Sequence, residues 1–213
     1  MAVRMDLNIS LDGFMAATDQ TPENPMGEDW PRLVEAYIST RTFRARVLGE
    51  TSGEGTTGVD DDYARAYFEN VGAGIMGAGM FGLHSFPDDP DWRGWWDDEP
   101  PFRTPVFVLT HTPRPSLEMA GGTTFDFIEA SPHEALEGAI AVAGGKDVRI
   151  GGGAAVARDF LAADLVDQLH VAVAPIVLGR GLRLWDDLRG LEDRYEATAE
   201  AASNGTVHLT FRR

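Results

Sequence analysis

The chain of 213 residues contains no cysteine. This absence excludes disulfide bonds, thiolate metal sites and cysteine nucleophiles. The sequence also lacks any run approaching the roughly 18 apolar residues that a membrane-spanning helix needs. Its beginning, "MAVRMDLNISLDGF", moves directly into an alternating apolar pattern without the apolar core of a signal peptide. We therefore expect a soluble, cytoplasmic protein that does not bind membranes.

Basic residues are few, with 18 Lys and Arg against 34 Asp and Glu, which gives a formal net charge of −16. Neutralising the phosphates of a nucleic acid or an anionic membrane needs clustered Lys and Arg, so neither is an expected partner. A small anionic ligand stays possible, because backbone N–H groups at a helix N-terminus can hold a phosphate locally. The expected partner is thus a small molecule.

Apolar and turn patterns predict an α/β fold. Val3–Ser10 alternates as a strand and stops at "LDG". Residues 131–145 form the clearest helix, in which Ser131 is the N-cap, Pro132 is at N1 and Glu134 completes a capping box. Further helices are expected at 29–48, at 59–71 and at 154–163, and a hairpin around Asn204 and Gly205. Alternating strands and helices predict a central, mostly parallel sheet with helices on both faces and an antiparallel C-terminal edge.

The 43% hydrophobic content suits a single domain with a real core. We expect one domain over residues 1–213, with a loop and helix insertion at about 18–58. The segment 49–58, "GETSGEGTTG", has the composition of a linker.

Two glycine-rich stretches match the dinucleotide fingerprint G-x-G-x-x-G, "GAGIMG" and "GAGMFG". The first has its strand inside the motif, and the second leads into a Pro- and Trp-rich loop, residues 84–104, so the context argues against a Rossmann unit. Glycine junctions at 77–79 and 151–153 still lie where strands run into helices. Each could be only a tight connection, but with the polar strand end at 110–112 they suggest three loops converging on one phosphate-bearing ligand.

The pieces "NISLDGFMA", "GAGIMGAGMFG", "PVFVLTHTPR", "GGTTFDFI" and "VRIGGGAAVARDFLAADLVDQLHVAVAPIVLGRGLRLW" resemble the dihydrofolate reductase-like superfamily. The similar branch contains the reductase domain of bacterial riboflavin biosynthesis and its stand-alone relatives. The last piece carries the most specific likeness, because glycine triplet, helix, strand and "P-x-V-L-G-x-G" turn follow in the family's order. Most of the chain apart from residues 18–58 is covered.

The resemblance implies a site for NADPH, with NADH possible. The implied cofactor-binding residues are Gly77, Ala78, Gly79, Met80, Thr110, His111, Thr112, Arg114, Ile150, Gly151, Gly152, Gly153, Ala154, Ala155 and Val156. Gly13, Phe14 and Met15, next to Asp12, would flank the nicotinamide and the substrate. Relatives commonly have Arg where this chain has Ala78, which leaves the preference for NADPH dependent on Arg114 or another cation.

The proton donor is left open between Asp61 or a neighbouring aspartate, Asp12 and a bound water. Dihydrofolate reductases keep a carboxylate early in the helix before the "IMG" strand, which points to Asp61. The competing interpretations are a charged helix N-terminus for residues 60–62 and a turn for Asp12. None of the five histidines has metal-ligand spacing with another, so no metal site is expected.

The expected activity is hydride transfer from NAD(P)H to a small heterocyclic or carbonyl substrate, similar to the ribosylaminopyrimidine reductase of riboflavin biosynthesis. The alternatives are a nucleotide-binding protein without catalysis and a pterin or dihydrofolate reductase. A zinc deaminase of the kind often fused to such reductases is not expected, because its P-C-x-x-C signature needs cysteine.

The apolar segment "LHVAVAPIVLGRGLRLW" and the tryptophans of residues 84–104 predict a homodimer. Those tryptophans could equally cap a substrate pocket or anchor their loop.

Overall fold

The computed structural model describes residues 1–16, 21, 23–24, 26–86, 89–96 and 98–213. Within these ranges nine strands form one sheet, in the order β10-β11-β8-β1-β7-β3-β4-β6-β5. The strands are β1 (Val3–Ser10), β3 (Val71–Gly77), β4 (Pro105–Leu109), β5 (Leu117–Glu118), β6 (Thr124–Ile128), β7 (Asp147–Ile150), β8 (Gln168–Ala174), β10 (Glu196–Ala201) and β11 (Val207–Arg212). The short strands β2 (Phe14–Ala16) and β9 (Leu182–Arg183) pair separately.

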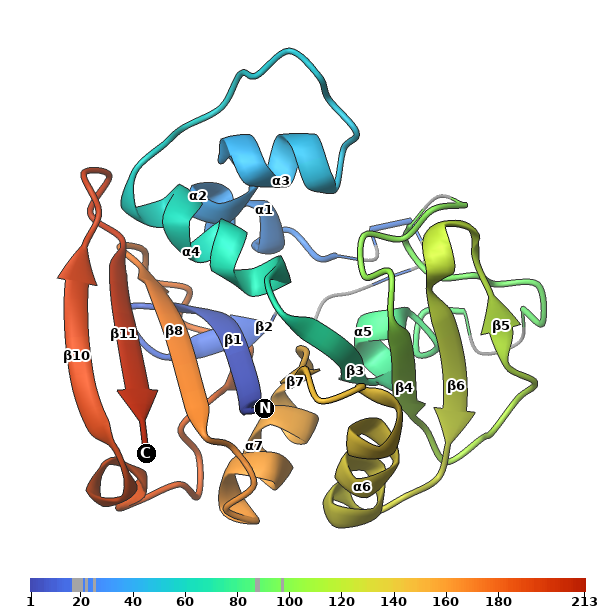
Figure 1. Cartoon of the computed structure of the whole chain (residues 1–213). Coiled ribbons are helices and arrows are strands. Elements are labelled where there is room, and N and C mark those ends of the chain that lie inside the picture. Colours follow the sequence, from blue (N-terminus) through green and yellow to red (C-terminus); the bar gives the residue numbers. More distant parts are fainter. Residues whose placement is uncertain (17–20, 22, 25, 87–88, 97) are drawn as a thin grey trace.

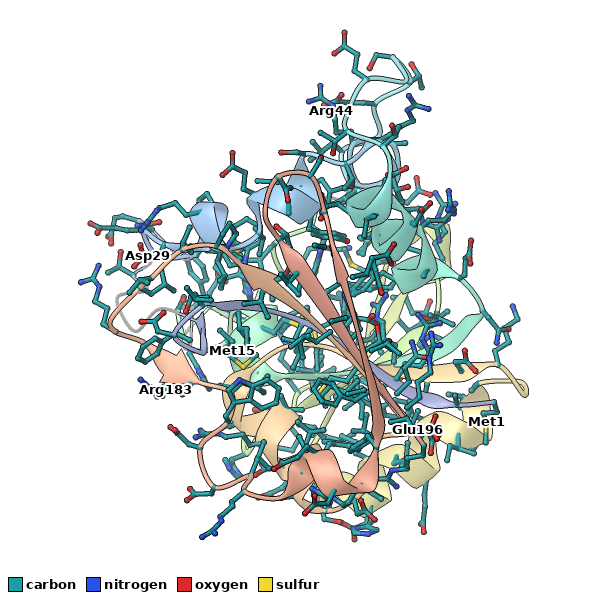
Figure 2. All side chains as sticks on the ribbon, turned by 90° about the vertical axis from the view of Figure 1, so that its left-hand side faces the viewer. Met1, Met15, Asp29, Arg44, Arg183 and Glu196 are labelled. Atoms are coloured by element: carbon teal, nitrogen blue, oxygen red, sulfur yellow. The ribbon has the colours of Figure 1, made fainter. Side chains whose placement is uncertain are left out.

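The centre of the sheet is parallel, from β8 through β1, β7, β3 and β4 to β6. The β10–β11 hairpin adds antiparallel strands at one edge, which confirms the expected C-terminal edge. The two-residue strand β5 adds an antiparallel strand at the opposite edge, which the sequence did not predict. Figure 1 shows these two edges at opposite sides of the molecule, and Figure 2 looks onto the hairpin edge, where Glu196 begins β10.

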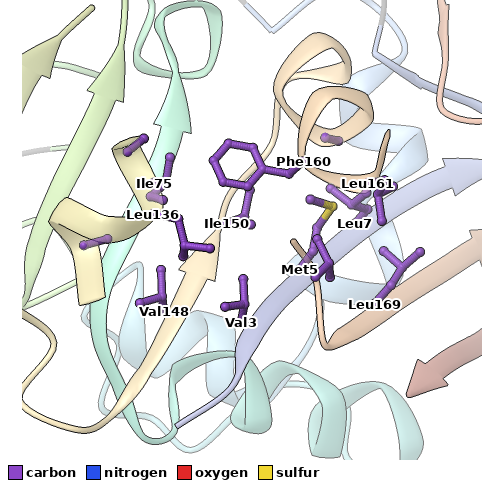
Figure 3. Close-up of a cluster of buried hydrophobic side chains, with 14 of the residues drawn as sticks. Val3, Met5, Leu7, Ile75, Leu136, Val148, Ile150, Phe160, Leu161 and Leu169 are labelled. Atoms are coloured by element: carbon purple, nitrogen blue, oxygen red, sulfur yellow. The ribbon is translucent and has the colours of Figure 1, made fainter. Parts of the chain in front are cut away.

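Alternation along β1 separates the two faces of the sheet. Its odd-numbered residues, among them Met5 and Leu7, are buried with apolar residues of β3, β7 and β8. Helices α6 (Pro132–Val142) and α7 (Ala154–Ala162) cover this face, and Figure 3 shows Leu136 and Phe160 packed against the strands. This face forms the larger apolar core.

The opposite face is covered in two parts. Helix α5 (Ala78–Phe81) packs over β3, β4 and β6, where Phe81 is fully buried among Met76, Phe125 and Phe127. Helix α4 (Val59–Phe68) and the short helices α1 (Trp30–Leu33), α2 (Glu35–Ile38) and α3 (Arg41–Arg46) lie together on the side of the sheet away from α6 and α7 (Figure 1). Helices therefore lie on both faces, as expected.

The single helix expected at 29–48 is wrong, because the chain there forms α1, α2 and α3. Val34 leaves helical geometry with φ −107° and ψ 11°. Thr40 is extended, and its side chain accepts a hydrogen bond from the backbone N–H of Phe43. A threonine at an N-cap starts a new helix at that point, and propensity alone does not reveal it. Elsewhere the capping box is confirmed: Ser131 and Glu134 form both of its reciprocal hydrogen bonds.

Two buried arginines fix α4 over the sheet. Arg4 of β1 donates to the carbonyl oxygens of Ala66 and Glu69, and Arg149 of β7 donates to that of Tyr67. The last carbonyls of a helix have no partners within the helix and carry partial negative charge, so cations are favoured there. The C-terminal end of α4 is thereby held on β1 and β7. The N-terminal residues of α4 lie over β8 and β11.

Candidate active site

A cavity of about 1510 Å³ lies at the carboxyl ends of the parallel strands. Ligands of open α/β sheets bind at this end. Its wall includes every residue in the implied cofactor set except Ile150 and Gly151. Ile150 is fully buried in the core, and Gly151 donates its N–H to the Ile75 carbonyl at 2.6 Å. These two residues support the wall from behind.

The junction between β7 and α7 presents bare backbone to the cavity. Gly153 is the N-cap of α7, has φ 109° and offers no side chain to the amides that follow it. The Gly152 N–H has the Met80 Sδ at 3.0 Å as its partner, and a thioether accepts hydrogen bonds only weakly. Amides in the first turn of a helix have no acceptor within it. This junction can therefore hold an anion of the ligand.

The junction between β3 and α5 lies beside it. A Cβ built on Gly77 would come 2.9 Å from Val156 Cγ2, so the two junctions are in contact and a larger residue at 77 would force the Val156 side chain to shift. A Cβ on Gly79 would lie 3.1 Å from His84 Nδ1. By contrast, Gly72 has a packing reason for being glycine, because a Cβ there would be 2.0 Å from the Ala143 carbonyl oxygen. The first glycine of the "GAGIMG" match is therefore explained by the packing of β3 against the C-terminal end of α6.

The end of β4 forms the third part of this wall. Thr110 donates its N–H to the Ile128 carbonyl, and its hydroxyl accepts from the N–H of Thr112. The His111 side chain is 98% exposed and faces Glu129 at 3.3 Å, so it belongs to the rim. Arg114 is the only arginine or lysine among the described residues of the cavity wall. It donates to the Trp92 carbonyl at 2.5 Å, with its guanidinium 4.8 Å from the centre of the Phe127 ring.

The tryptophans of residues 84–104 anchor their loop to the protein. Trp92 and Trp95 donate their Nε1–H groups to the carbonyls of Phe81 and Met80, at 2.9 and 3.0 Å. The Trp96 ring stacks with Phe125, with ring centres 5.6 Å apart. Trp95 and Trp96 also line the cavity. The loop therefore holds α5 in place and closes one side of the site.

The two aspartates proposed as proton donors, Asp12 and Asp61, both accept hydrogen bonds from backbone N–H groups outside the cavity wall. Asp12 accepts from Ser10 and from the N–H groups of Leu178 and Gly179. The Ser10 hydrogen bond lowers the pKa of Asp12 to about 2. Asp61 is buried and accepts from the N–H of Thr42 at 2.7 Å. Neither aspartate is among the described residues of the cavity wall.

Of the residues expected to flank the substrate, Met15 lines the cavity. Gly13 has φ 87°, and its carbonyl accepts from the N–H of Leu184. Phe14 is buried under the guanidinium of Arg183, which lies 4.8 Å from the centre of its ring. Figure 2 shows Met15 and Arg183 on the same side of the molecule. In the structure, Gly13 and Phe14 thus support the turn that presents Met15.

A polar floor of the cavity, formed by side chains of the sheet and of α4, was not predicted as a group. It consists of Asp6, Asp60, Tyr63, His170 and His208, all of which line the cavity. The signal for it is present in β1, whose even-numbered residues are Arg4, Asp6, Asn8 and Ser10. A central strand of a parallel sheet is normally apolar on both faces, so a polar face there indicates a site. The pairing of β1 with β8 and of β8 with β11 then brings in the histidines.

Comparison with known proteins gives the family. The chain is similar in structure to a candidate riboflavin biosynthesis protein from Shewanella sp. PV-4, with 19% identity, a TM-score of 0.60, and 100% of this chain and 99% of that chain covered. Acinetobacter baumannii RibD is 15% identical with a TM-score of 0.53, over 99% of this chain and 57% of that chain. No curated protein sequence matches. The model of the RibD C-terminal domain matches residues 1–207, and the chain therefore belongs to the RibD C-terminal domain family.

Proposed function

We propose that this protein is an NAD(P)H-dependent reductase of a small heterocyclic or carbonyl substrate. The observation that carries the proposal is the bare-backbone wall at the carboxyl ends of β3 and β7, where Gly152 and Gly153 face a cavity large enough for a dinucleotide and a second small molecule. Family membership supports the same reaction class, since the chain matches the RibD C-terminal domain.

The residues present fit a dinucleotide. The first-turn amides of α7 and the N–H of Gly152 would hold the pyrophosphate. Thr110, Thr112 and Arg114 would lie near the adenosine ribose and a 2′-phosphate. Ala78 would lie against the phosphates without adding a charge, so Arg114 supplies the only guanidinium available in the described wall. The fit rests on backbone donors more than on charged side chains.

A nicotinamide cofactor supplies the hydride when bound, so the protein has to position the substrate, exclude water and supply a proton. The apolar part of the wall, with Trp30, Tyr37, Phe43 and Phe68, would cover a flat ring or a short carbonyl compound. The polar floor would orient its heteroatoms. Asp12 and Asp61 stay hypotheses for the proton donor, but their hydrogen bonds to backbone N–H groups give each a structural task.

The test measures binding first and turnover second. Calorimetric titration with NADPH and NADH should give saturable binding to the wild type. Oxidation of the bound cofactor should follow with members of a panel of pterins, ribosylaminopyrimidines and aldehydes. Binding of neither cofactor would overturn the proposal. Binding without oxidation by any of the panel would favour the alternative, a nucleotide-binding protein without catalysis. The presence of Ala78 where relatives commonly have Arg is the reason for considering this alternative.

A further inference from the structure

Three polar side chains of the cavity wall have unused hydrogen-bonding capacity. Asn8 of β1, Tyr37 of α2 and Tyr67 of α4 line the cavity and are half-buried. Among the described residues, the side-chain amide of Asn8 and the two phenol hydroxyls have no hydrogen-bond partner. Polar groups taken out of bulk water are rarely left unpaired in a folded protein. These three side chains therefore mark the part of the wall whose hydrogen bonds a bound molecule can complete.

The polar floor next to them is in a different state. His170 Nε2 lies 2.9 Å from His208 Nδ1, and His208 Nε2 lies 2.8 Å from Asp60 Oδ1, so these side chains use much of their capacity on one another. Asn8 lies two residues after Asp6 in β1, on the same face of the strand. Asn8 thus continues the floor toward the carboxyl end of β1 with a side chain that is free to bind a ligand.

Tyr37 is held in place by the rings around it. Its ring centre lies 4.9 Å from that of Phe43, in an edge arrangement, and 5.8 Å from that of Tyr67 on the neighbouring helix α4 (Figure 1). Burial, with Tyr67 and Asp6 in the surroundings, raises the pKa of Tyr37 well above its usual range, against the opposing effect of Arg149. Its hydroxyl therefore keeps its proton and offers both a hydrogen and a lone pair. A ring fixed in advance loses little freedom when a ligand binds.

The charges of the wall disfavour an anionic substrate. Arg114 is the only Arg or Lys among the described residues of the wall, and it lies beyond the end of β4, where the adenosine end of the cofactor is proposed. The acidic residues of the described wall are Asp6, Asp60, Asp89, Glu129 and Asp159. A phosphate on the substrate, added to the phosphates of the cofactor, would enter a wall with more acidic than basic groups and without a guanidinium of its own.

Two other arginines contact rings of the wall from outside its described residues. The Arg149 guanidinium lies 3.8 Å from the centre of the Tyr67 ring and donates to the Tyr67 carbonyl, and the Arg46 guanidinium lies 5.2 Å from the centre of the Phe68 ring. Their charge meets aromatic rings, which attract cations through their faces. The cavity is thus presented with these rings.

We propose that the substrate is an uncharged, flat heterocycle without a phosphate group, and that Asn8, Tyr37 and Tyr67 bind an edge of it that both donates and accepts hydrogen bonds. This inference rests on the proposed reductase function and names the substrate class for it. The amide of Asn8 has an N–H donor and a carbonyl acceptor, and each phenol can act as either, so the set matches a lactam-type edge. The rings of Phe43 and Phe68 line the same cavity and would cover the faces of the heterocycle.

The substrate class is tested with three compounds that share a flat bicyclic ring. 6-Hydroxymethylpterin is uncharged at neutral pH and has a donor–acceptor edge, 6-hydroxymethylpterin phosphate adds the phosphate, and 2-naphthalenemethanol lacks the edge. Calorimetric titration into the wild type, with and without NADP⁺, should give saturable binding of 6-hydroxymethylpterin and about tenfold or more weaker binding of the other two. Binding of either of these as tight as that of 6-hydroxymethylpterin, or no binding of 6-hydroxymethylpterin, would overturn the proposal.

The binding residues are tested with single substitutions. Tyr37→Phe and Asn8→Leu should each weaken the binding of 6-hydroxymethylpterin by about tenfold, since each removes a hydrogen bond, and should not weaken that of NADPH or 2-naphthalenemethanol. Tyr195→Phe is the control, because the Tyr195 hydroxyl donates to the Val166 carbonyl, outside the described wall. Unchanged affinity in Tyr37→Phe and Asn8→Leu, or an equal loss for all of these compounds, would contradict binding by these side chains.

Turnover separates this inference from the proposed function. If 6-hydroxymethylpterin binds as expected but no compound of the panel oxidises NADPH, the reductase function fails and the assignment of the binding edge stands. If NADPH is oxidised with other substrates while 6-hydroxymethylpterin does not bind, the reductase function stands and the assignment of the substrate class fails.

Discussion

The ring of Tyr63 lies parallel to that of His208, with the ring centres 4.2 Å apart and an interplanar angle of 1°. It covers His170 in the same way, with an interplanar angle of 10°. One tyrosine of α4 thus covers two imidazoles of the sheet and packs the helix against β8 and β11. Its phenol oxygen makes only a long contact with Thr210, at 3.3 Å.

We therefore predict that the ring of Tyr63 matters much more than its hydroxyl. Tyr63→Ala should lower the free energy of unfolding by about 2–4 kcal/mol, because it removes two stacked pairs and leaves a cavity. Tyr63→Phe should cost less than about 1 kcal/mol. Urea unfolding of both variants checks this. Equal losses would show that the stacking does not stabilise α4.

The lowered pKa of Asp12 predicts that its turn stabilises the fold less at acid pH. Its hydrogen bond with Ser10, together with those from Leu178 and Gly179, lowers its pKa to about 2. A carboxyl with a lowered pKa in the folded state stabilises the fold above the pKa of the unfolded chain, about 3.9. This contribution is lost as the pH falls from about 4 to about 2. Asp12→Asn should be less stable than the wild type near neutral pH and should approach it at the acid end.

Thermal unfolding at a series of pH values measures the difference. Glu118→Gln, an exposed carboxylate on the edge strand β5, is the control and should follow the wild type at every pH. A constant difference between Asp12→Asn and the wild type over this range would contradict the assignment.

Cofactor choice should depend on Arg114. A 2′-phosphate carries about two negative charges near neutral pH, and a hydrogen bond to a charged group contributes roughly 1.5–3 kcal/mol. Because Arg114 also contacts Trp92 and Phe127, we expect NADPH to be preferred over NADH by only about tenfold. Arg114→Ala should abolish the preference and leave the NADH dissociation constant unchanged, which serves as the control. A hundredfold preference that survives the substitution would mean that another cation binds the 2′-phosphate.

A homodimer stays a prediction, with a different basis from the sequence argument. The tryptophans of residues 84–104 pack on their own chain, so they offer little surface to a partner. Exposed apolar side chains gather elsewhere: Leu11 is 67% and Val177 63% exposed, and the Leu11 N–H bonds the Ile176 carbonyl, so the two lie close together. We expect Leu11→Ser with Val177→Ser to dissociate the dimer. Light scattering of the wild type that gave only the 23.1 kDa mass would refute it.

Local signals predicted the fold well where they act within one segment. The turn at Gly13 ends β1, the Ser131 and Glu134 side chains start α6, and Pro175 follows the end of β8. The prediction of a single helix over 29–48 failed because Thr40 starts a new helix through a cap that helix propensity does not reveal.

The polar floor was missed because Asp6, His170 and His208 are far apart in the sequence and meet only through strand pairing. Both glycine junctions line one cavity, apart from Gly151, and their role in binding a cofactor is still a prediction.

Gly152 offers the most direct test of that role. A Cβ built on it would meet only the Met80 Sδ, at 3.6 Å, so a side chain there should leave the fold intact while it fills the proposed pyrophosphate position. Gly138→Ala is the control, since its Cβ would lie 3.6 Å from Phe107 on the opposite face of the sheet. Gly152→Val and Gly138→Ala should both unfold at temperatures close to that of the wild type.

The deciding measurement is calorimetric titration of NADPH into the wild type, Gly152→Val and Gly138→Ala. We predict that Gly152→Val, folded as judged by its unchanged circular dichroism, weakens NADPH binding by about 100-fold or more, because it excludes the phosphates from the amides of α7. Gly138→Ala should bind as the wild type does. Unchanged NADPH affinity in folded Gly152→Val, or no binding by the wild type, would contradict the account.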